Sequence, residues 1–247
     1  MGRKIPWHYR IVKAAVRKLS PKYVSEKTEM IPDKPCVVVS NHCQVYGPVA
    51  LQFYIERPTS VWCTYEMTEL KEVPAYAYKD FWSQKPKATK WIFKFLSYII
   101  APLAVYVFKY ADIVPVYKDM RLLKTIKCSI EKLESGENIH IFPEKADIHN
   151  NIVNEFQDRF VDLAKMYYVR THEKLEFVPM YLSPVLKKIV YGKPIEYNPD
   201  NPIDTERRRI CDYLMDEITS IAGSLPEHRV IPYLNIKKKD YPKNRLE

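Results

Sequence analysis

The segment that most constrains the fold is a short β-branched run, residues 36–40 (CVVVS), which leads directly into the polar residues Asn41 and His42. A continuous apolar run of this length is typical of a strand buried on both faces. Gly47-Pro48 then precedes the apolar segment VALQFYI, and proline is favoured in the first turn of a helix. The sequence therefore predicts a strand, a polar loop and a helix in direct succession.

The same alternation recurs along the chain. We expect further strands at residues 61–64, 113–116, 139–142, 177–180 and 188–191, and helices at 122–133, 155–170 and 204–222. Strands that alternate with helices indicate an α/β protein with a largely parallel central sheet flanked by helices. Pro115 lacks an N–H group, which places strand 113–116 at an edge of the sheet.

The net charge of +9 is concentrated at the two ends of the chain. Residues 1–28 carry eight Lys and Arg against one Glu, and residues 237–247 carry five against two acids, so the remainder is almost neutral. We divide the chain into a basic N-terminal helix (1–28), an α/β domain (29–232) and a loose polar tail (233–247). The charged ends favour an anionic partner, either a membrane surface or a nucleic acid. Because helix-turn-helix and zinc-knuckle signatures are lacking, we expect a membrane and no nucleic acid.

Two apolar segments also favour a membrane surface. Residues 5–19 form a basic amphipathic pattern, typical either of a helix in a bilayer interface or of one packed on the domain with its basic face in water. Residues 91–108 are the most apolar stretch, but Lys94 and Pro102 interrupt it. A spanning helix needs about 20 apolar residues. We therefore expect residues 91–108 to form a buried or interface-dipping helix pair. We also expect a cytoplasmic protein with reduced cysteines, peripheral on the inner face of the membrane.

Titratable side chains follow three of the expected strands. His42 and Glu144 each follow an apolar strand, and Lys118 follows strand 113–116. In open α/β sheets, functional groups gather where the carboxyl ends of the strands meet the loops. A histidine, a carboxylate and a cation at one edge suit acyl or phosphoryl transfer near an anionic substrate. Cys43 adjoins His42, but adjacent side chains rarely face each other, which disfavours a Cys/His pair.

Four blocks, VVVSNH, VPVYK, GENIHIFPE and FVPMY, occur in this order over residues 36–182. Together they resemble the glycerol-phosphate and lysophosphatidate acyltransferase family. The resemblance implies transfer of a fatty acyl group from acyl-CoA or acyl-carrier protein, as co-substrate, to the hydroxyl of a lysophospholipid-type acceptor. It implies His42 as the general base, and no metal or bound cofactor.

The sequence departs from the family pattern at several positions. Gly47 stands where the family has the Asp that orients the histidine, and Lys118 stands where it has an Arg for the acceptor phosphate. Residues 145–147 (KAD) replace a Gly-Thr-Arg segment. We assign three groups of site residues: catalytic (His42, Glu144, Asp147), phosphate-binding (Lys118, Arg121, Lys145) and other loop residues (Asn41, Cys43, Gly47).

The missing aspartate leaves three alternatives open. In serine proteases, loss of the carboxylate that orients the catalytic histidine lowers turnover about 10⁴-fold. In the first, another carboxylate, such as Glu144 or Asp147, orients the histidine. In the second, the acceptor or the donor differs from that of the family. In the third, the protein keeps the fold and binds lipid or membrane without acyl transfer.

Overall fold

The structure is a computed structural model that describes residues 6–55, 57–82, 85–117 and 119–246. Its strands are β1 (Val24–Glu26), β2 (Val37–Ser40), β3 (Thr59–Thr64), β4 (Ile113–Val116), β5 (Asn138–Ile141), β6 (Glu144–Ile148), β7 (Asn154–Phe156), β8 (Glu176–Ser183), β9 (Lys188–Tyr191) and β10 (Ile195–Glu196). Its α-helices are α1 (Trp7–Leu19), α2 (Tyr46–Tyr54), α3 (Val73–Ala77), α4 (Lys90–Tyr110), α5 (Leu122–Glu134), α6 (Asp162–Thr171) and α7 (Ile203–Ser224). The predicted α/β class is confirmed.

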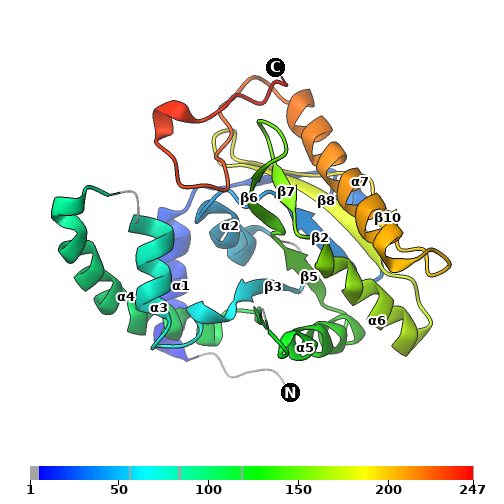
Figure 1. Ribbon diagram of the computed structural model, residues 1–247, viewed down its shortest axis with the longest axis horizontal. Coiled ribbons are helices and arrows are strands. Elements are labelled where there is room, and N and C mark those ends of the chain that lie inside the picture. Colours follow the sequence, from blue (N-terminus) through cyan, green and yellow to red (C-terminus); the bar gives the residue numbers. More distant parts are fainter. Residues whose placement is uncertain (1–5, 56, 83–84, 118, 247) are drawn as a thin grey trace.

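The central sheet has the order β1-β9-β8-β2-β5-β3-β4 (Figure 1). The neighbours of β2, which are β5 and β8, both run parallel to it, as do the pairs β3–β5 and β3–β4. Within this sheet β8 pairs antiparallel with β9 and β10, and β6 and β7 form a separate antiparallel hairpin. The loops after β2, β5, β3 and β4 therefore leave the sheet at the same edge, and β4 is the edge strand that Pro115 predicts.

Strand β2 is buried on both faces, which explains its unbroken apolar run. Val37 and Val39 contribute to the core packed under α5, α6 and α7, whereas Val38 belongs to a second core that includes Ala50 and Leu51 of α2. Successive side chains of a strand point to opposite faces of the sheet. The end of β2 is thus enclosed from both sides, and the chain that follows it starts from a fixed position.

Helices α3 and α4 pack against each other beside the β3–β4 end of the sheet, with α1 next to them (Figure 1). The segment expected as a helix pair at residues 91–108 is instead one helix, α4, which continues through Pro102. Its buried side carries small residues, Ser97, Ala101 and Ala104, because these allow the close approach of α3.

Three other predictions need correction. The helix expected at 155–170 begins later, because residues 154–156 pair in the β6–β7 hairpin and α6 starts at Asp162. The helix expected at 204–222 extends through Gly223 to Ser224. The tail after Pro232 is not loose: Asn244 is fully buried, and its side chain hydrogen-bonds to the backbone of residues 222–228.

Candidate active site

The loop that carries His42 leaves the end of β2 in an unusual backbone conformation. Cys43 and Gln44 both have left-handed backbone angles, with φ of 50° and 53°. For residues other than glycine this conformation costs about 1–3 kcal/mol each, and it persists where surrounding contacts enforce it. Such strain is concentrated at functional sites, so the contacts that hold this loop show which residues the fold keeps in place there.

Asn41 anchors the start of the loop to β8. Its side-chain Oδ1 accepts a hydrogen bond of 2.9 Å from the N–H of Leu182, and its Nδ2 donates to the carbonyl of the same residue at 3.1 Å. The side chain thus takes the place of a backbone partner and extends the β2–β8 pairing beyond the strand. Asn41 is a structural residue that positions the loop.

Glu144 holds the backbone of His42 and does not contact its ring. Oε1 accepts a 2.6 Å hydrogen bond from the N–H of His42, and Oε2 accepts one of 2.9 Å from the N–H of Asn154. The carboxyl group thereby connects the loop to the β6–β7 hairpin. Burial raises the pKa of Glu144 to about 7, against the opposing effect of these two hydrogen bonds.

The carbonyl oxygen of His42 approaches Gly47 so closely that the position has no room for a side chain. A Cβ atom at Gly47 would lie 2.2 Å from this oxygen and 3.0 Å from a ring carbon of Phe142. Any other residue here requires the backbone of the loop to move. This gives a physical reason why an Asp is lacking at this position: in the present loop conformation, none fits.

The imidazole of His42 lies between two aromatic rings. Its centroid is 4.9 Å from that of Phe142 and 5.7 Å from that of Tyr233, which comes from the C-terminal segment. Nδ1 is buried and has no hydrogen-bond partner among the described residues, so neither Glu144 nor Asp147 orients the ring through this atom. Burial lowers the pKa of His42 to about 4, which makes the ring neutral at pH 7.

A second histidine lies behind the first. His140 on β5 is fully buried, and its Nε2 is 2.8 Å from Oγ of Ser40. Its ring also contacts Phe142, at 4.8 Å between centroids, so Phe142 separates the two imidazoles. Burial lowers the pKa of His140 to about 3. Because it lies wholly within the core, His140 has a structural role.

Cys43 does not have the properties of a nucleophile. Its Sγ lies within the core, 2.9 Å from Nδ2 of Asn41 and 3.3 Å from the carbonyl oxygen of Leu182. Burial raises its pKa well above the usual range, so the thiol stays protonated. Reactive cysteines are thiolates, and all five cysteines of this chain are unpaired.

The predicted phosphate-binding residues are not brought together. Lys118 lies outside the described residues. Arg121 lies near the ends of β3 and β4, where its guanidinium is 4.8 Å from the ring centroid of Tyr65 and 4.5 Å from that of Tyr117. The same group makes a bidentate contact with Asp119, at 2.7–3.0 Å. This contact lowers the pKa of Asp119 to about 2, and it leaves Arg121 partly exposed.

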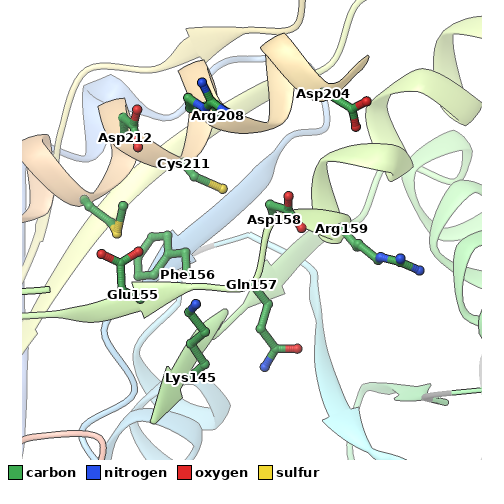
Figure 2. Close-up of a pocket in the computed structure, with 11 residues that line it drawn as sticks. Lys145, Glu155, Phe156, Gln157, Asp158, Arg159, Asp204, Arg208, Cys211 and Asp212 are labelled. Carbon is green, nitrogen blue, oxygen red and sulfur yellow. The ribbon is translucent and has the colours of Figure 1, made fainter. Parts of the chain in front are cut away.

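Lys145 and Asp147 lie away from the His42 ring. They pair with each other at 3.1 Å on β6, where the Asp147 side chain is 71% exposed. Lys145 lines a surface pocket of about 590 Å³ that lies between the β6–β7 hairpin and α7 (Figure 2). His42 is not among the residues that line this pocket, which carries mixed charge, including Asp158, Asp204 and Arg208. Neither residue therefore contributes to the surroundings of the imidazole.

Sequence reasoning missed the aromatic residues that enclose His42. The side of the sheet that Phe142 faces is predictable from its strand position, because it alternates with Ile141 and so faces α2. Tyr233 gave no local signal, because it reaches His42 from the other end of the chain. Among the described residues, no group of three or more His, Cys, Asp or Glu side chains is arranged to hold a metal ion.

Comparisons with known proteins show a likeness of fold only. No protein-family model matches the sequence, and no curated protein matches it. A crystal structure of the 1-acyl-sn-glycerophosphate acyltransferase PlsC from Thermotoga maritima superposes with a TM-score of 0.49 at 14% identity, covering 88% of this chain and 81% of that one. A likeness at this level does not assign a function to the chain.

Proposed function

We propose that the protein transfers a fatty acyl group to the hydroxyl of a lysophospholipid-type acceptor, with His42 as the general base. The observation that carries the proposal is the imidazole of His42: it is neutral, and it follows β2 on a loop in a strained conformation. A buried polar atom without a partner does not by itself mark a site, because Nδ1 of the core residue His140 is one as well as Nδ1 of His42. The strained loop, Asn41 and Glu144 all fix the backbone that presents His42, and such strain is concentrated at functional sites.

In the proposed reaction, a ring nitrogen of His42 accepts the proton of the acceptor hydroxyl. The oxygen then attacks the carbonyl carbon of an acyl thioester, from acyl-CoA or acyl-carrier protein. A carbon–oxygen bond forms, the carbon–sulfur bond breaks, and the imidazolium returns its proton to the leaving thiolate. Glu144 acts as a positioning residue, because it holds the N–H of His42 and not the ring.

Arg121 is the described cation that we propose for the acceptor phosphate. The contacts with Asp119 use Nε and one terminal nitrogen of the guanidinium, and the side chain of Tyr65 is a further hydrogen-bond partner, so we propose that a phosphate oxygen binds at the exposed side of the group. Tyr65 and Tyr117 fix the plane of the group. Neighbouring strands lie about 4.8 Å apart, so β3 and β4 place this cation two to three strand spacings from the end of β2.

We propose that the reaction takes place at a membrane surface, with α4 in contact with lipid. Among the described residues, 87–110 form a helical stretch long and apolar enough to span a membrane, yet only 11% of its most apolar 18-residue part is buried. Several large residues of α4 point outward: Trp91, Phe95, Tyr98 and Leu103 are each more than half exposed. Exposed apolar area of this extent is typical of a surface that binds a membrane or a partner.

The test is an acyl-transfer assay with acyl-CoA or acyl-carrier protein and a panel of lysophospholipids in vesicles. We expect wild type to be active and His42→Ala to lose at least 10²-fold in rate, the usual range for a general base. His149→Ala is the matched control, because His149 lies on the β6–β7 side, paired with Glu155, and should keep wild-type activity. Equal rates for wild type and His42→Ala would end the proposal.

The second candidate is a protein that binds lipid without transferring acyl groups. It is favoured by the lack of room for an Asp at position 47 and by the low pKa of His42, about 4. Binding to anionic vesicles with no transfer of any acyl group in the same samples would support this function. Transfer that requires His42 would exclude it.

A further inference from the structure

The C-terminal loop of residues 230–242 lies next to the His42 loop and is closed at its base. The N–H of Val230 donates to the carbonyl of Pro242 at 2.9 Å, and Arg229 pairs with Lys243 in an antiparallel bridge. Figure 1 shows this segment in orange to red, near α2 and β6. This hydrogen bond and this bridge thus hold the two ends of the loop together.

The base of the loop is part of the folded core. Oδ1 of the buried Asn244 accepts a hydrogen bond of 2.8 Å from the N–H of His228, and its Nδ2 donates to the carbonyl of Ala222 at 2.7 Å. Ile231 is 8% exposed and belongs to the same core as α2. These contacts are short and enclosed, so the base keeps its position when the tip moves.

The loop contacts His42 and its neighbour Gln44 directly, through residues close to its closed end. The ring of Tyr233 stands edge-on to that of His42, and Nε2 of Gln44 donates to the carbonyl of Leu234 and to the hydroxyl of Tyr241, both at 3.3 Å. These hydrogen bonds are longer than the common value of about 2.9 Å, and longer than those at the base. The loop is held by a shorter bond elsewhere, since a guanidinium nitrogen of Arg229 donates to the carbonyl of Lys238 at 2.8 Å, so the part that covers His42 has the longer hydrogen bonds.

The outer side of the tip is positively charged. Lys237, Lys238 and Lys239 are consecutive and exposed, with Asp240 as the adjacent acid. Clusters of lysines bind phosphate-bearing surfaces, and anionic lipid provides such a surface at high local density. The lysines lie in the same loop as Tyr233, so a movement of the lysines displaces the Tyr233 ring from His42.

We propose that residues 230–242 form a lid over His42 that opens when Lys237, Lys238 and Lys239 bind an anionic lipid surface. The inference rests on the proposed function, in which His42 is the reactive group. The movement itself is measurable without acyl transfer, because an uncovered neutral imidazole reacts with diethyl pyrocarbonate.

The experiment measures the rate of this modification at His42 by peptide mass spectrometry on the full chain, with the core residue His140 as the internal reference for unfolding. We expect slow modification of wild type alone and at least a tenfold acceleration with phosphatidylglycerol vesicles. Phosphatidylcholine vesicles and inorganic phosphate should give no acceleration. K237Q/K238Q/K239Q should lose the response, whereas the charge-matched K124Q/K127Q/K165Q, at exposed sites on α5 and α6, should keep it.

Two further variants test the contact with the ring. Tyr233→Ala should be modified at least tenfold faster at His42 than wild type without vesicles, and Tyr233→Phe, which keeps the ring, should stay slow. Equal rates in wild type and Tyr233→Ala, or no response to anionic vesicles, would overturn the lid. Acceleration by inorganic phosphate would overturn the lipid surface as the trigger. Vesicle-dependent modification without any acyl transfer would refute the proposed function and leave the lid intact.

Discussion

Replacement of Glu144 by glutamine should change how the stability of the protein depends on pH. Both carboxyl oxygens accept hydrogen bonds, from the N–H groups of His42 and Asn154. The amide nitrogen of glutamine accepts none, so one buried N–H group loses its partner in Glu144→Gln. This loss should lower the free energy of unfolding by about 1–3 kcal/mol at every pH.

The titration of Glu144 adds a second, pH-dependent contribution. Burial raises its pKa from the ordinary 4.5 to about 7, so between these values the folded state binds more protons than the unfolded state. The stability of wild type therefore falls as pH rises from 4.5 to 7. One pKa unit corresponds to about 1.4 kcal/mol, so the whole effect is about 3 kcal/mol. The glutamine side chain does not titrate, so Glu144→Gln does not lose this stability as the pH rises.

The two contributions oppose each other above pH 7. Glu144→Gln should be about 1–3 kcal/mol less stable than wild type near pH 4.5, and between equally stable and about 2 kcal/mol more stable at pH 8.5. Urea unfolding of both proteins across this range measures the difference. Burial also lowers the pKa values of His42 and His140, to about 4 and about 3, but both proteins contain these groups and their effect cancels. A variant that is destabilised as much at pH 8.5 as at pH 4.5 would refute the reasoning.

Three other substitutions test the loop and the lipid-facing helix. Gly47→Ala places a Cβ 2.2 Å from a carbonyl oxygen and should cost about 1–3 kcal/mol in urea unfolding; unchanged stability would show that the loop moves freely. Asn41→Ala removes two hydrogen bonds to the β8 backbone and should cost about 2–4 kcal/mol by the same measurement, whereas a loss below about 1 kcal/mol would count against the anchor. Leu103→Glu on α4 should weaken vesicle flotation at least tenfold, whereas Leu123→Glu on α5, at a similarly exposed leucine, should not; equal flotation of the two would exclude α4 as the lipid contact.

The sequence predicts the strands better than the loops, for a physical reason. The run 37–39 is apolar and β-branched because both faces of β2 are buried, and this pattern is local. The alternation of strands with helices is enough to predict a parallel sheet with His42 and Glu144 at a common edge. Which atom of Glu144 meets which atom of the loop depends on backbone angles that no local pattern encodes.

Helix α4 shows a different limit of prediction from sequence. Residues 91–108 are apolar on nearly all sides, so periodicity does not tell which side packs inward. The structure shows that Ala101 and Ala104 pack against α3, while large residues such as Trp91, Phe95 and Leu103 face outward. Hydrophobicity alone predicts the reverse, because it places the largest apolar side chains in the core.

The lid and the low basicity of His42 lead to a last prediction. With its ring enclosed, His42 has a pKa of about 4, below its ordinary 6.5, so it accepts a proton poorly in the closed form. Gly47 leaves no room for a carboxylate that would offset this, so access of water is the remaining way to restore basicity. Tyr233→Ala should expose the ring, and its kcat/KM for acyl transfer should then rise with pH through about 6.5, because a general base acts in its unprotonated form. A profile for this variant that rises only near pH 4 would mean that the base works enclosed, and that opening of the lid serves entry of the acceptor alone.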